Sequence, residues 1–412
     1  MSDELMEHDG ESSTMAKPSP APSSTPPPYI TSVDLMRGLV MVLMALDHVR
    51  GFFTNADFSS TDLARTTPGV FLTRWITHLC APTFVFLAGT SAYLSASRGM
   101  AHSQLAKRLF LRGLWLVFLE LTVVRFAWFF NLDYNLMDLQ VIWALGWSMI
   151  VLAALVYLPL WAVAGVGIGM ILTHNLLDSI RLEDFQAAGG SLTWKGWLVS
   201  VLHIPHFPVV YPLIPWIGVM ASGYAFGPLM LLPSRTRIKV VFKCGTILVA
   251  GFLILRGLNI YGDPDPWVLQ ETPVFTLLSF LNTTKYPPSL LYLLMTLGLM
   301  FLLISAFEWW HEAHGPHGVA GRFLITFGRV PLFFYLIHLY FIHGFTLLIA
   351  FAMGANIRSF LTSSWEFPSW WGFSLPVVYL VWVGVTTTLY PICRRFAALK
   401  SRHRGSWWTP YI

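Results

Sequence analysis

The sequence predicts an all-α, polytopic integral membrane protein of about ten transmembrane helices with both termini in the cytoplasm. Of its 412 residues, 55% are hydrophobic and 11% are charged, whereas soluble domains contain about 25% charged residues. Aromatic residues make up 15% of the chain and include 18 tryptophans. This composition is typical of a protein whose helices are anchored by aromatic side chains at both membrane interfaces.

Stretches of roughly 20 mainly apolar residues are the predicted spans. They are 33–53, 70–97, 107–130, 139–157, 158–177, 208–230, 238–258, 288–307, 331–351 and 373–393. The fourth and fifth are divided only at Pro159, because proline lacks the N–H that a continuing helix needs. We expect a disordered Pro/Ser-rich cytoplasmic leader at 1–29, a membrane domain over 30–396 and a basic cytoplasmic tail at 397–412.

The positions of lysine and arginine predict the orientation. Most of the 26 basic residues fall in segments that are cytoplasmic if the N-terminus is inside, and the tail RRFAALKSRHR is rich in them. Because basic loops stay on the cytoplasmic side, an even number of spans is favoured. We therefore interpret the net charge of +5 as a sign of topology and not of nucleic-acid binding.

The first predicted span, 33–53, contains several ionisable residues. A charge near the bilayer centre costs roughly 2.5–3.5 kcal/mol on insertion scales, so Asp34, Arg37, Asp47 and His48 indicate function or pairing. Arg37 and His48 are separated by about three helical turns and therefore share a face. We expect a polar stripe that runs from one membrane surface toward the other.

The second span contains the stretch RWITHLCAPTFVFLAG. Arg74 and His78 lie on one face of the predicted helix, since residues four positions apart are neighbours. Pro82 removes the usual helical partner of the His78 carbonyl. The freed carbonyl is expected to bind a ligand or a neighbouring helix, or else to be satisfied by another side chain at a kink.

Asp47 and His48 are adjacent in sequence, so their side chains point about 100° apart on a helix. If Asp47 orients a histidine, His78 is therefore the better placed partner. Such a pair could take a proton from an attacking amine or hydroxyl. The alternative is a structural network in which Asp47 neutralises Arg50 or Arg74.

The ninth span begins GRVPLFFYLIHLYFIHG, with Arg329 just before a proline that suits the first turn of a helix. His338 and His343 are five residues apart and do not share a face, so these two alone do not predict a metal site. His338 either lines a central cavity or is a buried, hydrogen-bonded histidine.

Three further ionisable residues lie in predicted spans. Glu120 and Arg125 are five positions apart and do not stack directly, so we expect each to pair with another helix. Arg256, near the outer end of the seventh span, is expected to extend to the membrane surface, or alternatively to contact an anionic group.

No metal site is predicted. The segment HEAHGPH carries His311, His314 and His317, but its spacing matches no closed zinc site and its Gly and Pro indicate a solvated loop. The 3 cysteines lie far apart in or beside apolar runs and predict no disulfide framework. The sequence contains no phosphate-binding P-loop, no serine-nucleophile motif and no dinucleotide fingerprint.

Four stretches carry a resemblance to a known family: SVDLMRGLVMVLMALDH, RWITHLCAPTFVFLAGTS, KYPPSLLYLLMTLG and FGRVPLFFYLIHLYFIH. The sequence resembles bacterial members of the heparan-alpha-glucosaminide N-acetyltransferase catalytic-domain family, within the wider transmembrane acyltransferases. Asp34, Arg37 and Gly38 match the opening SVDxxRG motif, which we interpret as a structural or donor-side feature. The animal enzyme has an important histidine between its first two spans, whereas 54–73 contains none.

The resemblance implies an acyl-CoA-dependent N- or O-acyltransferase of the inner (plasma) membrane. It would move an acetyl or other acyl group from cytoplasmic acyl-CoA to an extracytoplasmic sugar or glycan, with no metal and no nucleic acid. Either His48 or His78 would be the general base, with Asp47 orienting it or compensating charge. The residues expected to bind substrate are Asp34, Arg37, Arg74, Arg329 and His338.

Two other classes of function remain open from the sequence. The same intramembrane charges would suit a transporter or channel for a small polar solute, or the chain could be a non-catalytic scaffold in envelope-polymer synthesis. We find no internal repeat, which argues against the common transporter plans. The acceptor, the acyl chain, homo-oligomerisation, and the choice between direct transfer and an acyl-histidine intermediate are also left open.

Overall fold

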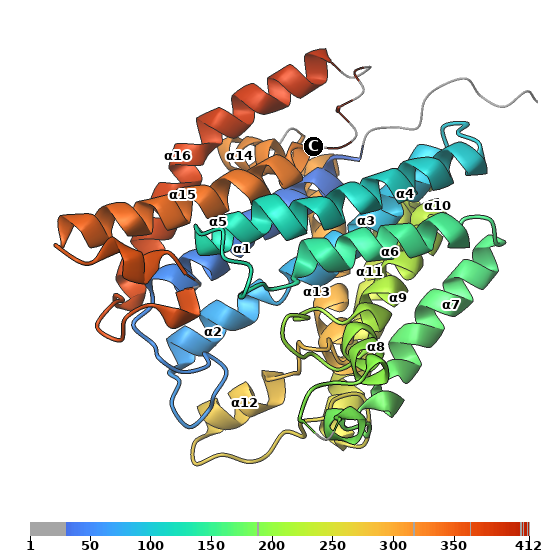
Figure 1. The fold of residues 1–412 in the computed structure, drawn as a ribbon. Coiled ribbons are helices and arrows are strands. Elements are labelled where there is room, and N and C mark those ends of the chain that lie inside the picture. The colour runs from blue at the N-terminus through green and yellow to red at the C-terminus, as the bar shows by residue number, and fades with distance from the viewer. Residues whose placement is uncertain are drawn as a thin grey trace, which may run out of the picture.

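The computed structural model describes residues 30–412 except 188, 316–317, 363, 404–405, 407, 410 and 412. Within these residues the chain forms helices and no β-strands (Figure 1), which confirms the all-α class. The predicted leader at 1–29 lies outside the described part of the chain.

Helices occupy every one of the predicted spans. They are α1 Thr31–Phe53, α2 Pro68–Thr77, α3 Cys80–Ala96, α4 His102–Leu119, α5 Arg125–Phe129, α6 Val141–Leu155, α7 Leu160–Thr173, α8 Trp194–Leu202, α9 Leu213–Ala225, α10 Gly227–Met230, α11 Ser234–Leu258, α12 Pro273–Leu281, α13 Leu290–His314, α14 Val319–Arg329, α15 Pro331–Ala352 and α16 Leu375–Arg402. A π-helical segment, Glu120–Val124, joins α4 to α5. The predicted break at Pro159 is confirmed, because this residue directly precedes α7.

Local chemistry sets many of the helix ends. The side chains of Thr67, Thr272 and Ser289 accept a hydrogen bond from a backbone N–H in the first turn of α2, α12 and α13. Proline occupies the first turn of α2, α12 and α15, where no N–H is missed. Phe130 and Asn259 adopt the left-handed conformation that ends α5 and α11.

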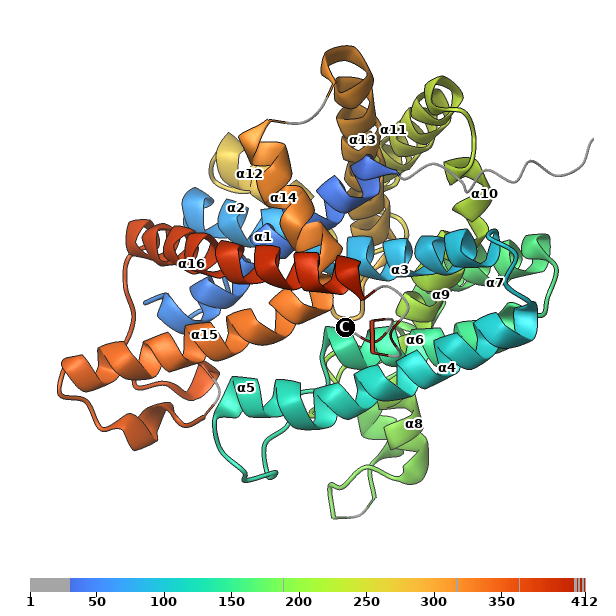
Figure 2. The same ribbon diagram turned by 90° about the horizontal axis from the view of Figure 1, so that it is seen from above.

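Helix α1 lies at the centre of the molecule. It packs against α3, α13, α14, α15 and α16, which surround it in the two views of Figures 1 and 2, and most of its side chains are buried. Outside this group, α4 packs on α6, α7 and α3 pack on α9, and α11 packs on α13. The charged residues of the first span are therefore surrounded by protein.

Glycines bring α1 and α14 into backbone contact. A Cβ at Gly38 would overlap the carbonyl oxygen of Leu324, and a Cβ at Gly328 would overlap the carbonyl oxygen of Asp34. Such close approach of two helices needs residues without a side chain. Gly38 of the SVDxxRG stretch therefore has a packing role.

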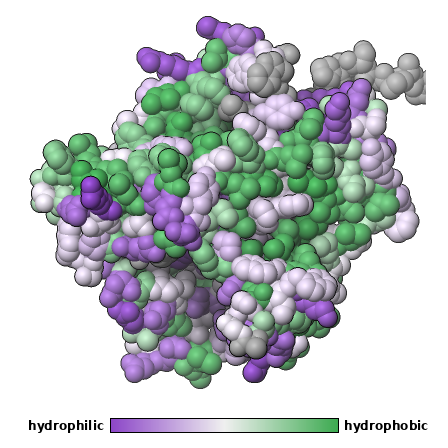
Figure 3. Space-filling model, viewed as in Figure 1, coloured by the Kyte–Doolittle hydropathy of each residue, from purple (hydrophilic) through white to green (hydrophobic). Residues whose placement is uncertain are grey.

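The outward-facing surface is apolar, as expected in lipid. In Figure 3, hydrophobic residues spread across the middle of the face and hydrophilic ones gather toward its upper and lower ends. Among the described residues, six helical segments are long and apolar enough to cross a membrane: Pro68–Ala96, Leu160–Leu177, Ser234–Leu258, Leu290–His314, Pro331–Ala352 and Leu375–Arg402. The chain is thus a multi-pass membrane protein, while the count of about ten crossings and the orientation stay predictions.

The predicted outer loops are partly helical. The segment 178–207 contains α8, and 259–287 contains α12. Arg256 holds the second of these loops, and the prediction that it extends to the membrane surface is wrong, because it is only 1% exposed. Its guanidinium donates to the carbonyls of Asp265, Ser279, Phe280 and Asn282.

Arg125 and Glu120 also bind loop segments. Arg125 donates to the carbonyls of three residues that follow α5, namely Asn131, Asp133 and Leu136. Glu120 accepts a hydrogen bond of 2.6 Å from the backbone N–H of Gln140. The prediction that each pairs with another helix is therefore wrong for Arg125, whose partners lie in the segment between α5 and α6. Glu120 does contact another helix, because Gln140 caps the start of α6 and the backbone of Trp143 within α6 also interacts with it.

Candidate functional site

A cavity of about 1480 Å³ lies beside α1, between α3, α4, α6, α14, α15 and α16. Pockets for drug-sized ligands have volumes of roughly 300–1,000 Å³. The cavity is therefore large enough for a ligand bigger than a simple solute. We call it the cationic cavity, because of the residues that line one end of it.

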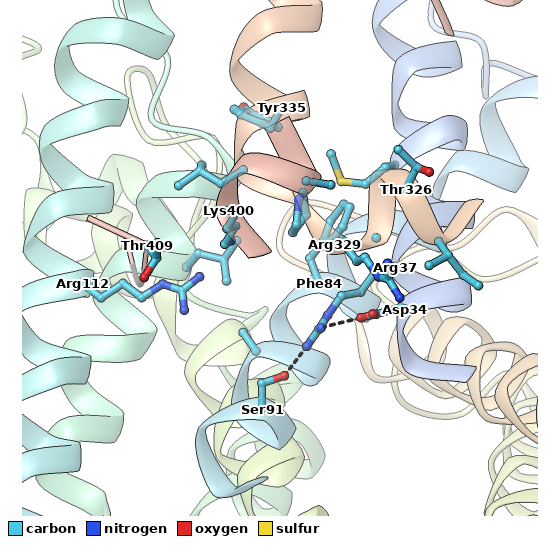
Figure 4. A pocket seen from close by; sticks show the side chains of 18 of the residues that line it. Asp34, Arg37, Phe84, Ser91, Arg112, Thr326, Arg329, Tyr335, Lys400 and Thr409 are labelled. Carbon is cyan, nitrogen blue, oxygen red and sulfur yellow. Dashed lines mark hydrogen bonds and ion pairs between the residues drawn. The ribbon is translucent and has the colours of Figure 1, made fainter. Parts of the chain in front are cut away.

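Basic residues from four helices, α1, α4, α14 and α16, line this cavity. They are Arg37, Arg108, Arg112, Arg322, Arg329, Arg394 and Lys400. Among the described lining residues the carboxylate is Asp34. Figure 4 shows Arg37, Arg112, Arg329 and Lys400 around one space. Because cations outnumber carboxylates, this end of the cavity favours a polyanionic ligand.

Asp34 and Arg37 form an ion pair at this end, with an Nη1–Oδ1 distance of 3.3 Å. The Arg37 guanidinium also donates to the carbonyl of Leu87 and to the hydroxyl of Ser91 on α3 (Figure 4). The interlocked glycines of α1 and α14 place this pair next to the end of α14, where Arg329 also lines the cavity. The structure thus brings together three residues predicted to bind substrate.

Arg112 differs from Arg37 in having no partner among the described residues. It forms no hydrogen bond or ion pair with a described residue, and its Nε is buried without a partner. Figure 4 shows its guanidinium directed into the cavity. Buried polar groups are normally hydrogen-bonded, so the unpartnered Nε makes Arg112 a candidate contact for an anionic ligand.

The cavity becomes apolar along α1. Met41 and Met44 follow Arg37 by one and two turns, and Leu116 follows Arg112 by one turn on α4. Tyr335 of α15 lines the cavity at this apolar end. The predicted stripe on α1 is therefore the wall of a cavity, with charge at one end and methionine at the other.

His48 and His338 form a hydrogen-bonded pair just beyond the apolar end. His48 follows Met44 by one turn on α1, and His338 follows Tyr335 by about one turn on α15. His48 Nδ1 lies 2.7 Å from His338 Nε2. The His48 ring also packs edge-on against Trp128, with ring centroids 5.0 Å apart.

Asp47 belongs to a separate ionic network. It forms ion pairs with Arg74 and with Arg50, the latter at 3.1 Å, and Arg50 donates to the hydroxyl of Ser60 at 2.7 Å. The structure therefore matches the alternative in which Asp47 neutralises arginines. It places no described hydrogen bond between Asp47 and either His48 or His78.

His78 lies apart from the histidine pair. The carbonyl that Pro82 leaves without a helical partner accepts a hydrogen bond of 2.7 Å from the Tyr292 hydroxyl of α13. The kink is thus satisfied by another side chain, as one of the alternatives predicted. The His78 ring is buried, and its Nδ1 has no described partner.

The sequence reasoning missed most of the cationic lining. Arg108, Arg112, Arg322 and Arg394 were assigned to topology, although Arg108 and Arg112 lie four positions apart on one face of α4, a signal that was available. The pairing of His48 with His338 carried no such signal, because the two residues are far apart in the chain.

The described residues contain no group of three or more His, Cys, Asp or Glu placed to hold a metal ion. In the HEAHGPH segment, α13 extends through His314, so the first part of the predicted loop is helix. His314 stacks on Trp310, with ring centroids 4.1 Å apart. His317 lies outside the described residues.

The fold and the cavity together define a multi-pass α-helical membrane protein with a large, cationic internal binding site. Residues 30–262 match the model of the family described as heparan-alpha-glucosaminide N-acetyltransferase, catalytic. This match covers more than half of the chain, and the chain belongs to that family. No curated protein matches the sequence. The family assigns the chain to the transmembrane acetyltransferases.

Proposed function

We propose that the chain transfers an acetyl or other acyl group from cytoplasmic acyl-CoA to an extracytoplasmic sugar or glycan, in the inner (plasma) membrane. The observation that carries this proposal is the cationic cavity, in which Arg112 has no partner among the described residues. CoA carries a diphosphate and a further phosphate on its ribose, and arginine is well suited to phosphate groups. The family supports acetyl-CoA as the donor.

The graded lining suits the shape of such a donor. The phosphates would bind among the basic residues, and the less polar arm of CoA would extend along Met41 and Met44 toward Tyr335. This orientation brings the thioester toward the end of the cavity next to His48. Asp34, Arg37 and Arg329 would then serve the donor, as the sequence predicted.

The reaction requires one bond exchange and one proton transfer. The acceptor amine or hydroxyl attacks the acyl carbonyl carbon, a C–N or C–O bond forms, and the C–S bond breaks to release CoA thiolate. The acceptor's proton passes to a general base and then to the thiolate, so the products are the acylated acceptor and CoA. We assign the base to His48, since its ring is only half-buried and follows Met44 of the cavity wall by one turn, whereas the His78 ring is buried.

The acceptor would approach His48 from the opposite side of the membrane. Asp47 and Arg50, which flank His48 on α1, form an ionic network with Arg74 of α2. Asp47 offsets one of the two arginine charges, so this side carries much less positive charge than the cationic cavity. A neutral or singly charged sugar fits this environment better than a second phosphate-rich ligand.

Binding of acetyl-CoA to the purified chain tests the donor site. Arg112→Gln should weaken binding by about 10–100-fold, because a hydrogen bond to a charged group contributes about 1.5–3 kcal/mol. Isothermal titration in detergent measures the effect. Lys107→Gln is the matched control, since Lys107 is exposed on the same helix, carries the same charge and does not line the cavity.

Two results would contradict the proposal. Equal affinity of wild type, Arg112→Gln and Lys107→Gln would place CoA outside the cationic cavity. No binding of acetyl-CoA or longer acyl-CoAs to well-folded protein would remove the acyltransferase assignment. Uptake of a polar solute into vesicles without CoA would then favour the transporter, and absence of both activities would favour the scaffold.

A further inference from the structure

The hydrogen bonds of the histidine pair determine where its protons lie. His338 Nδ1 is 2.8 Å from the carbonyl oxygen of Phe334, one turn earlier on α15. A carbonyl can only accept, so Nδ1 of His338 must carry a proton. In the neutral ring the other nitrogen, Nε2, is then an acceptor.

The protonation of His338 determines that of His48. His338 Nε2 faces Nδ1 of His48 at 2.7 Å, so His48 must donate from Nδ1. In a neutral His48 the remaining nitrogen, Nε2, therefore has a lone pair and no proton. In the opposite tautomer of His338, a lone pair on Nδ1 would face the lone pairs of the Phe334 carbonyl oxygen, and this hydrogen bond would be lost. With both rings neutral, one arrangement alone satisfies both hydrogen bonds.

The two rings differ in accessibility. His338 is fully buried, whereas His48 is half-buried. No described residue forms a hydrogen bond with His48 Nε2, and this atom is not among the buried polar atoms that lack a partner. The lone pair of His48 thus faces accessible space, while its Nδ1 is fixed by the protein.

We propose that His338 is a positioning residue that holds His48 in the tautomer and orientation of a general base. The proposal rests on the acyltransferase function proposed above and names both members of its proton-transfer site. The backbone carbonyl of Phe334 orients His338, and His338 orients His48. His338 therefore holds the position behind His48 that a carboxylate occupies behind the catalytic histidine of other enzymes.

The proton path follows from this arrangement. The attacking amine or hydroxyl gives its proton to Nε2 of His48 as the bond to the acyl carbon forms. The resulting imidazolium keeps its Nδ1–H bond to His338 Nε2, which stabilises the charge without a second proton transfer. The Nε2 proton then passes to the departing CoA thiolate, and His48 returns to its starting tautomer.

Steady-state kinetics with acetyl-CoA distinguish a positioning role of His338 from a purely structural one. Purified full-length protein is assayed for release of CoA thiol, with water as the acceptor, and for acetyl-CoA binding. His338→Leu removes the acceptor for His48 Nδ1–H and should lower kcat about 10²-fold or more at unchanged Kd. His338→Gln supplies an amide oxygen as acceptor and should recover at least about tenfold of that loss.

His343→Gln is the control on the same helix. Both ring nitrogens of His343 contact backbone carbonyls, those of Ala127 at 3.0 Å and of Phe360 at 2.8 Å. This histidine therefore joins α15 to neighbouring segments, and its substitution should lower the melting temperature while kcat stays within about threefold of wild type. Folded His338→Leu protein with wild-type kcat, or equal kcat losses in His338→Leu and His343→Gln, would overturn the proposal.

NMR spectroscopy of the wild-type protein identifies the tautomer of His48 directly and needs no variant. In ¹⁵N-histidine-labelled wild-type protein, His48 should show a protonated Nδ1 and a bare Nε2, with coupling across the bond to His338. A proton on Nε2 of His48 would contradict the proposal. Wild-type protein that has this tautomer but neither binds nor cleaves acetyl-CoA would instead refute the proposed function.

Discussion

The arginines at the two ends of the molecule are used in opposite ways. Around the cationic cavity, basic residues from four helices face one space that contains a single carboxylate among its described lining residues. In the other half, Arg50 and Arg74 share Asp47, and Arg256 is enclosed by backbone carbonyls. In the proposed function, the same residue type thus serves a ligand in one region, whereas it holds protein segments together in the other.

This difference shows that the acceptors around a buried arginine indicate its role. A guanidinium has five N–H donors, and in the outer region carboxylates and carbonyls of the protein itself accept from them. Within the described part of the chain, Arg112 has no such acceptors. An arginine whose donors are satisfied by protein contributes to stability, whereas one whose donors face a cavity indicates a ligand.

Asp47→Asn should have the largest effect among the variants that test this difference between the two regions. It removes the carboxylate shared by Arg50 and Arg74 and leaves two largely buried cations without their counter-charge. We expect a loss of about 3–5 kcal/mol in the free energy of unfolding, seen as a large drop in the apparent melting temperature. Adding Arg74→Met, which removes one cation, should restore part of the loss. An unchanged melting temperature in the single variant would show that the network is not structural.

Arg256→Gln should have the next largest effect. The substitution removes donors from four carbonyls that hold the loop containing α12, and we expect a loss of about 3 kcal/mol. Arg112→Gln is the counterpart in the cavity and should change the free energy of unfolding by less than about 0.5 kcal/mol. Thermal unfolding of both variants measures this difference, and equal losses would remove the distinction between the two regions.

The smallest expected effect concerns Tyr286, in the loop before α13. Burial raises its pKa, but Lys285 and Arg74 outweigh burial and lower the pKa from 10.0 to about 8. Between about pH 8 and pH 10 the unfolded chain therefore holds a proton that the folded chain has lost, so stability should rise with pH across this window. Absorbance of tyrosinate should show one group titrating near pH 8 that Tyr286→Phe lacks. Superimposable curves for the two proteins would contradict the pKa.

Patterns along one helix were predictable from the sequence. The spacing within the first span predicted a stripe along one helix face, and Asp34 and Arg37 of that span line the cavity together with Met41 and Met44. The break at Pro159 followed from the missing N–H of proline. In both cases the information lies within one or two turns of the same segment.

Contacts between distant segments could not be predicted in this way. The His48–His338 bond joins α1 to α15, and no periodicity in either helix identifies the partner. Arg256 was misjudged because its acceptors are backbone carbonyls, which every residue possesses and which no side-chain pattern marks. The basic residues of the cavity lining were attributed to membrane topology, because the positive-inside rule accounts for them without any ligand.

The interlocked glycines of α1 and α14 have a consequence for binding. Because the backbones touch at Gly38 and at Gly328, the two helices cannot slide past each other without lifting apart. Asp34 and Arg37 on one helix and Arg329 on the other therefore keep fixed mutual positions before any ligand arrives. This part of the cavity is preorganised, so a polyanion that binds there loses less entropy in ordering protein side chains, and affinity is gained without an additional contact.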